Sequence, residues 1–146
     1  MSVVTDKKRL VLEHYAMRQQ WGEAPRWCCN ADKNVYWWEY DLRLEENVFP
    51  LRVAYPDDFP ASPPELILQC ELPGGTPHLW PQKRTALPGP RLCWYHPTAV
   101  GRSRNVWNPA EDTAAMAIGV AYRWCLAFLV WMTTNQWPVP DALTAQ

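Results

Sequence analysis

The sequence lacks the features that mark membrane-spanning, secreted and disulfide-stapled proteins. It contains no run of about 18 consecutive apolar residues, and no apolar run of the kind a signal peptide needs follows Lys7, Lys8 and Arg9. The five cysteines include no Cys-x-x-Cys pair and no Cys/His cluster at metal-ligand spacing, which argues against disulfides, structural zinc and any bound metal. We therefore expect a cytoplasmic protein without a membrane partner.

An excess of positive charge is also lacking. The formal net charge is −1, and the basic residues are scattered apart from the N-terminal cluster and the pair Arg102 and Arg104, which we interpret as solvated loop charges. A protein without a basic patch has no general attraction for phosphate backbones, so nucleic acid is not an expected partner. The sequence also contains no internal repeat and no low-complexity segment. With 146 residues, 48% of them apolar, it predicts one domain over residues 1–146.

Proline and tryptophan, by contrast, are abundant. The 15 prolines are concentrated between Pro50 and Pro97 and predict rigid turns and extended segments there rather than helices. The 10 tryptophans lie between Trp21 and Trp137. Because each indole buries a large area, we expect most of them in the core and some on a binding surface.

The periodicity of apolar residues predicts an α+β order of elements. A helix is expected from Thr5, as its cap, to about Gln20. Strands are then predicted over residues 27–30, 35–44, 48–55 and 65–72. Pro50 predicts an edge position or a bulge in the third of these strands. Long ordered loops around one short strand at 91–94 follow, and such loops are usually functional.

A second helix is predicted over residues 110–133. Asn108 is the expected cap, Pro109 occupies the first helical position, and Glu111 completes a capping-box arrangement. This segment is apolar nearly all round, which predicts that the helix is covered on both sides.

The proline-rich centre of the chain carries a family resemblance. The run from Tyr55 to Pro64, YPDDFPASPP, resembles the aromatic-Pro-x-x-aromatic-Pro-x-x-Pro-Pro signature of ubiquitin-conjugating enzymes. Cys93 stands where that family has its active-site cysteine, Trp107-Asn108-Pro109 is similar to its Trp-x-Pro, and Pro77-His78 is similar to the start of its His-Pro-Asn element. The resemblance covers roughly residues 10–137. It implies a ubiquitin-conjugating-enzyme-like fold, an antiparallel four-stranded meander with an N-terminal helix and a long C-terminal helix.

The end of the chain adds to this resemblance. Residues 124–138 resemble the Trp-rich end of bacterial ubiquitin-conjugating-like proteins, which are encoded in antiphage and related operons. The implied partners are an activating-enzyme-like protein, a ubiquitin-like modifier and a protein target, with a nucleotidyltransferase as a candidate. A bacterial or phage-related origin is therefore expected.

The resemblance also implies a reaction. Cys93 would accept the C-terminal acyl group of a ubiquitin-like protein as a thioester and pass it to an amine or another nucleophile. A thiolate suits both steps because it attacks a thioester readily and leaves again readily. His96 is a candidate base or cation beside Cys93, and His78 is a further candidate, although a turn or structural role also fits each histidine. The implied reaction needs no metal and no organic cofactor.

The chain departs from the family pattern at the His-Pro-Asn element. His78 is followed by Leu79 and Trp80, and no asparagine lies between His78 and Cys93, so the expected oxyanion-type donor is missing from its usual place. Asn105 and Asn108 are candidate replacements, although helix capping already explains Asn108. We interpret the other four cysteines as core residues: Cys28, Cys29, Cys70 and Cys125.

Two other functions remain open on the sequence alone. The first is a catalytically inactive adaptor of the same fold that binds a ubiquitin-like protein or an operon partner. The second is a cysteine hydrolase, although no histidine and Asn/Asp partner can be assigned. The sequence leaves open the modifier, the acceptor and the oligomeric state.

Overall fold

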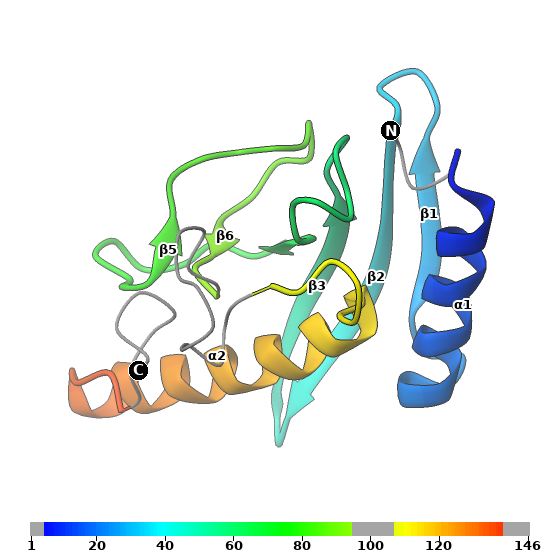
Figure 1. Cartoon of the computed structure of the whole chain (residues 1–146). Coiled ribbons are helices and arrows are strands. Elements are labelled where there is room, and N and C mark those ends of the chain that lie inside the picture. Colours follow the sequence, from blue (N-terminus) through cyan, green and yellow to red (C-terminus); the bar gives the residue numbers. More distant parts are fainter. Residues whose placement is uncertain (1–4, 95–106, 139–146) are drawn as a thin grey trace.

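Two helices pack on one face of an antiparallel sheet in the computed structural model, which describes residues 5–94 and 107–138 (Figure 1). The helices are α1 (Lys7–Trp21) and α2 (Ala114–Thr134). The strands are β1 (Arg26–Asn30), β2 (Val35–Leu44), β3 (Asn47–Tyr55), β4 (Glu65–Leu68), β5 (Leu79–Trp80) and β6 (Arg91–Leu92). Their order in the sheet is β1-β2-β3-β4-β6-β5, so the predicted four-stranded meander is confirmed and two short strands extend it.

The alternation along the strands separates two apolar clusters. One face of the sheet packs against the helices and forms the main core, with Trp38 and Leu42 of β2 and Val53 of β3 among its buried residues. The opposite face carries a smaller cluster of Val35, Trp37, Ala54 and Ile67, covered by Leu87 from the loop before β6. Side chains two residues apart share a face of a strand, so one strand contributes to both clusters.

Pro50 determines where β4 ends. The predicted strand at 65–72 stops at Leu68, which pairs with Leu51 of β3. Gln69 still donates its N–H to the carbonyl of Pro50 at 2.8 Å, but proline has no N–H to return, so the ladder cannot continue. Both expectations for Pro50 are wrong, because β3 lies inside the sheet between β2 and β4, and its register with β2 continues through the Asp41–Pro50 pair without a bulge.

Both helices begin at a cap other than the predicted one. Asp6, rather than Thr5, caps α1 by accepting the N–H of Arg9 at 3.1 Å. The predicted capping box at the start of α2 is also wrong, because α2 begins at Ala114 and Thr113 caps it. Residues 108–112 instead form a turn in which the Asn108 side chain accepts the N–H of Ala110.

The long helix α2 is a core element of this domain. Its length and composition alone would allow it to cross a membrane, a test that the core helices of many soluble proteins also pass. Its residues Ile118, Ala121 and Cys125 are fully buried in the main core beside the sheet. Leu126 and Met132 of this helix are exposed, so the predicted cover on both sides is absent at these two residues.

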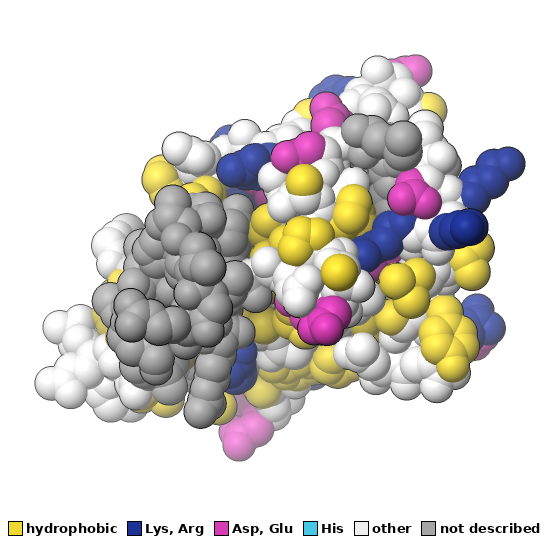
Figure 2. Space-filling view, viewed as in Figure 1, with side chains coloured by type: hydrophobic (Ala, Val, Ile, Leu, Met, Phe, Trp, Pro, Cys, Tyr) yellow, Lys and Arg dark blue, Asp and Glu magenta, His cyan; other side chains and the backbone are white. Residues whose placement is uncertain are grey.

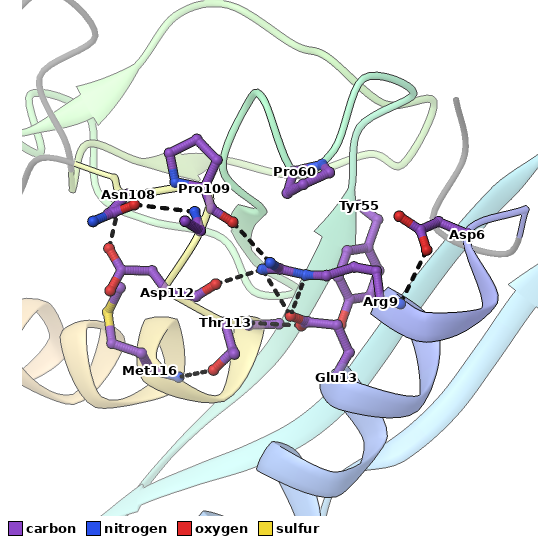
Figure 3. A network of polar contacts seen from close by, with 12 residues as sticks. Asp6, Arg9, Glu13, Tyr55, Pro60, Asn108, Pro109, Asp112, Thr113 and Met116 are labelled. Atoms are coloured by element: carbon purple, nitrogen blue, oxygen red, sulfur yellow. Dashed lines mark hydrogen bonds and ion pairs between the residues drawn. The ribbon is translucent and has the colours of Figure 1, made fainter.

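A buried ionic network joins α1 to the start of α2 (Figure 3). Glu13 is fully buried and Arg9 is 8% exposed, and their side chains form an ion pair at 3.1 Å. The Glu13 carboxylate also accepts the Tyr55 hydroxyl at 2.8 Å and the N–H of Ala114 at 2.9 Å. Burial raises the pKa of Glu13, while these hydrogen bonds and the Arg9 charge act in the opposite direction.

The guanidinium of Arg9 extends the network to the turn before α2. It donates to the carbonyls of Pro109 and Asp112 and lies 4.8 Å from the ring centroid of Phe59. Because the bonds use backbone carbonyls on one side and a buried carboxylate on the other, they fix α1 against the segment that enters α2.

The outward face of α1 takes no part in this packing. Over α1, at the right of Figure 2, apolar side chains are exposed beside Lys and Arg side chains. The exposed apolar residues are Val11, Leu12 and Tyr15. The opposite side of α1 supplies the buried Met17 to the core, so α1 has one packed face and one mixed apolar and basic face.

Candidate active site

Cys93 follows the last residue of β6 directly. Its N–H donates to the carbonyl of His78 at 2.9 Å, which continues the pairing of Leu79 with Leu92 by one residue. Cys93 is 5% exposed, and it is not in a disulfide. The strand expected at 91–94 is therefore two residues shorter than predicted. The backbone N–H of Cys93, just beyond the strand, is still hydrogen-bonded.

The backbone of His78 faces Cys93. Its carbonyl accepts two hydrogen bonds, from the N–H of Cys93 and from the indole Nε1 of Trp124 at 3.0 Å. His78 has a φ of 59°, a left-handed conformation that is unusual for a residue with a Cβ. Its ring lies 4.6 Å from that of Trp137. The structure thus brings together the predicted residues His78 and Cys93 through their main chains.

Two further tryptophans bind the proline turn, the segment of residues 55–64 between β3 and β4. The indole of Trp94 donates to the carbonyl of Pro64 at 3.2 Å, and that of Trp107 donates to the carbonyl of Pro60 at 2.7 Å. The two rings meet edge to face at 6.2 Å. The proline turn that links β3 to β4 therefore accepts hydrogen bonds from the residue after Cys93 and from the residue before the Asn108 turn.

A buried ion pair fixes β6 on the opposite face of the sheet. Arg91 and Glu65 are 3% and 7% exposed and lie 3.2 Å apart. Arg91 also donates to the carbonyls of Gly89 and Thr85, and the Thr85 hydroxyl donates to Glu65. With these partners the arginine fork holds the loop before β6 to β4, two residues upstream of Cys93.

The oxyanion donor missing from the sequence is not supplied by the amide of Cys93. In many acyl-transfer enzymes backbone N–H groups stabilise the oxyanion. Here the N–H of Cys93 is already engaged by His78. Asn108 is exposed, and its side-chain amide donates to Glu111 at 3.2 Å. His96, Asn105, Arg102 and Arg104 lie outside the described residues.

The other cysteines differ in burial, and the expectation that all four are core residues holds only in part. Cys125 is fully buried, and burial raises its pKa to about 12. Cys28 and Cys70 are half-buried, and burial raises the pKa of each thiol. Cys29 is exposed, so its assignment to the core is wrong.

Within residues 5–94 and 107–138 no group of three or more His, Cys, Asp or Glu side chains could hold a metal ion. Around Cys93 the described residues supply a thiol, a hydrogen-bonded main chain and the aromatic side chains that bind that main chain.

The comparison with protein families decides the relationship. Over residues 13–144 the chain matches the family described as Type II CBASS E2 protein. The chain belongs to this family. Its members are ubiquitin-conjugating-enzyme-like proteins of bacterial antiphage systems, and the family implies activating-enzyme-like and ubiquitin-like partners. The resemblance of the proline turn and of the Trp-rich end is thereby confirmed. No curated protein is similar enough to the chain to count as a match.

Three contacts around the site were not foreseen from the sequence of this family member. They are the bond from Trp124 to His78, the Arg91–Glu65 pair and the Arg9–Glu13 network. Each joins residues that local periodicity cannot relate, apart from the i,i+4 spacing of Arg9 and Glu13. One signal was present, since a charged residue beside apolar strand positions, such as Glu65, requires a partner if it is buried.

Proposed function

We propose that the protein is a ubiquitin-like-protein conjugating enzyme that carries the modifier as a thioester on Cys93 and transfers it to a target. The observation that carries the proposal is the position of Cys93, one residue past β6 and beside the proline turn, in a chain of this family. The proposed partners are an activating-enzyme-like protein, a ubiquitin-like modifier and a protein target such as a nucleotidyltransferase, in the cytoplasm.

The proposed reaction has two steps. In the first, the Cys93 thiolate attacks the carbonyl carbon of the thioester on the activating enzyme, a new C–S bond forms and the thiolate of the activating enzyme leaves. In the second, an amine of the target attacks the new thioester, a C–N bond forms, the amine loses a proton and the Cys93 thiolate leaves. His96, three residues after Cys93 in the sequence, is the proposed base or cation, and the protein otherwise acts by positioning the reactants.

The test is reconstitution with the co-encoded activating enzyme, nucleotide and modifier. The wild-type protein should form a conjugate that reducing agent cleaves, and Cys93→Ala should form none. Cys93→Ser should form nothing or an adduct that survives reductant and yields to hydroxide, because an oxyester exchanges poorly with thiols. Cys29→Ala is the matched control, since it removes an exposed thiol from β1 and should leave conjugation unchanged.

The adaptor of the same fold is the second candidate, and the low exposure of Cys93 favours it. An adaptor would bind the modifier or an operon partner equally well as wild type and as Cys93→Ala, without a covalent band. A reductant-sensitive conjugate that persists in Cys93→Ala would exclude Cys93 as the carrier. Complete absence of a conjugate with a verified cognate partner set would favour the adaptor.

A further inference from the structure

We infer that Trp124 of α2 is a positioning residue for Cys93 and acts through the main-chain carbonyl of His78. The inference rests on the proposed function and deepens it, since it names a residue on which the placement of the nucleophile depends. It also predicts a property of the backbone at Cys93 that is measurable without any conjugation partner.

The geometry consists of one carbonyl that serves two donors. The oxygen of His78 accepts the N–H of Cys93 at 2.9 Å and the indole N–H of Trp124 at 3.0 Å. A carbonyl oxygen has two lone pairs, so both bonds can form together. The carbonyl is thus held from β6 and from α2 at once, and the indole fixes the acceptor to which the Cys93 amide is bound.

Trp124 is itself held firmly. It is 5% exposed, and its ring stacks on Phe128 at a centroid distance of 5.5 Å with 10° between the ring planes. Trp137 packs edge to face against it at 5.3 Å and lies 4.6 Å from the His78 ring. Trp137 therefore contacts the ring of His78 while Trp124 binds its carbonyl, and the two tryptophans pack on each other.

The bond from the Trp124 indole matters because the backbone conformation of His78 is unfavourable unless other contacts hold it. A φ of 59° brings the Cβ of a non-glycine residue close to backbone atoms, so surrounding contacts must maintain the conformation. β5 and β6 are two residues each, and few ladder bonds are available to do so. Without the indole bond, the hydrogen bond between Cys93 and His78 should open more often. The Cys93 sulfur should then occupy a wider range of positions, fewer of them suited to attack.

The experiment compares Trp124→Phe with Trp21→Phe. The first change keeps an aromatic ring next to Phe128 and removes the N–H that His78 accepts. The second is the matched control, because the Trp21 indole also donates to a backbone carbonyl, that of Ala115 at 2.8 Å, and also stacks on an aromatic ring, that of Tyr122. Trp21 lies at the end of α1 and has no contact with the His78–Cys93 pairing described above.

Two readouts are measured on both variants. In single-turnover transfer from the charged activating enzyme, Trp124→Phe should lower the maximal rate about three- to tenfold, the range for one hydrogen bond, with little change in the half-saturating concentration. In amide hydrogen exchange followed by NMR, the Cys93 N–H of Trp124→Phe should exchange faster by a similar factor. Trp21→Phe should change neither quantity more than about twofold.

Each outcome decides the inference. Rates and Cys93 exchange in Trp124→Phe that match the wild type would overturn it, and so would equal losses in both variants, which would indicate a general effect on stability. If the wild type forms no conjugate, the proposed function fails, while the Cys93 amide exchange still decides the role of Trp124. If Trp124→Phe does not fold, Trp137→Leu removes the ring that packs on both Trp124 and His78, and unchanged Cys93 exchange in that variant would also overturn the inference.

Discussion

At the scale of single residues, His78 contributes to the site through its main chain. Its φ is left-handed and its carbonyl accepts two hydrogen bonds, while its ring packs against Trp137. Two substitutions separate the main chain from the imidazole. His78→Gly removes the ring and suits a φ of 59°, whereas His78→Ala removes the same ring and disfavours that conformation by about 1 kcal/mol.

If the backbone carries the role of His78, transfer by His78→Gly should exceed that by His78→Ala about fivefold, the factor that corresponds to this energy. The measurement is the rate of reductant-sensitive conjugate formation on Cys93. An imidazole that acts in the reaction would give equally large losses in both variants.

At the scale of secondary-structure elements, the contact between α1 and α2 depends on a charge pair withdrawn from water. Glu13→Gln keeps the shape of the side chain but leaves the charge of Arg9 buried without its counter-ion. Removal of one partner of a buried pair typically costs 3–5 kcal/mol, and we expect a loss of about 3 kcal/mol in the free energy of unfolding. Urea denaturation followed by tryptophan fluorescence measures this loss.

The matched control for this prediction lies just beyond the end of the same helix. Glu23 pairs with Arg18 at 3.7 Å, and both side chains are more than two-thirds exposed. Glu23→Gln should change the free energy of unfolding by less than about 0.5 kcal/mol, since exposed ion pairs contribute little. Equal costs for the two substitutions would show that burial does not set the strength of the Arg9–Glu13 pair.

The elements also show what the sequence could predict and what it could not. The strand at 35–44 was predicted with its observed bounds, because its aromatic and β-branched residues all favour a strand. The start of α2 was misplaced by four residues, because Asn108, Pro109 and Glu111 carry a helix-start pattern that tertiary contacts override. Arg9 binds the carbonyls of Pro109 and Asp112 from about 100 residues away, and this contact fixes a turn there instead.

The site shows the same division between local and distant information. The proline turn and Cys93 carry a family pattern within short segments, so their relation could be predicted. The bond from Trp124 to His78 joins residues 46 positions apart, and the sequence gives no local sign of it. The extent of β4 depends on Pro50 in a neighbouring strand, which a segment-by-segment prediction does not consider.

At the scale of the whole molecule, two buried groups keep their protons to higher pH in the folded protein than in the unfolded chain. Burial raises the pKa of Cys125 from 9.0 to about 12, and burial raises that of Tyr55 well above 10.0. The folded protein therefore keeps protons that the unfolded chain loses at alkaline pH. The stability these groups contribute is fully present below about pH 9 and is lost as the pH rises toward 12.

The free energy of unfolding should consequently fall between pH 9 and pH 11, by up to about 1.4 kcal/mol per pH unit for Cys125 when only the unfolded chain has lost the proton. Urea midpoints measured across this range test the prediction. Cys125→Ala removes one of the titrating groups and should give a shallower decline, even though it lowers stability at neutral pH by leaving a small cavity. Parallel pH curves for the two proteins would contradict it.

The anchors around Cys93 share a feature that bears on how the sequence can vary. Trp94, Trp107 and Trp124 each donate to a main-chain carbonyl, and Arg9 donates to two more. Every amino acid has such an oxygen, so these bonds constrain the donors and place no demand on the side chains of the acceptors. The bonds themselves therefore do not depend on the acceptors' side chains, so the carbonyl of His78 can hold Cys93 in place although the His-Pro-Asn pattern is absent from this sequence.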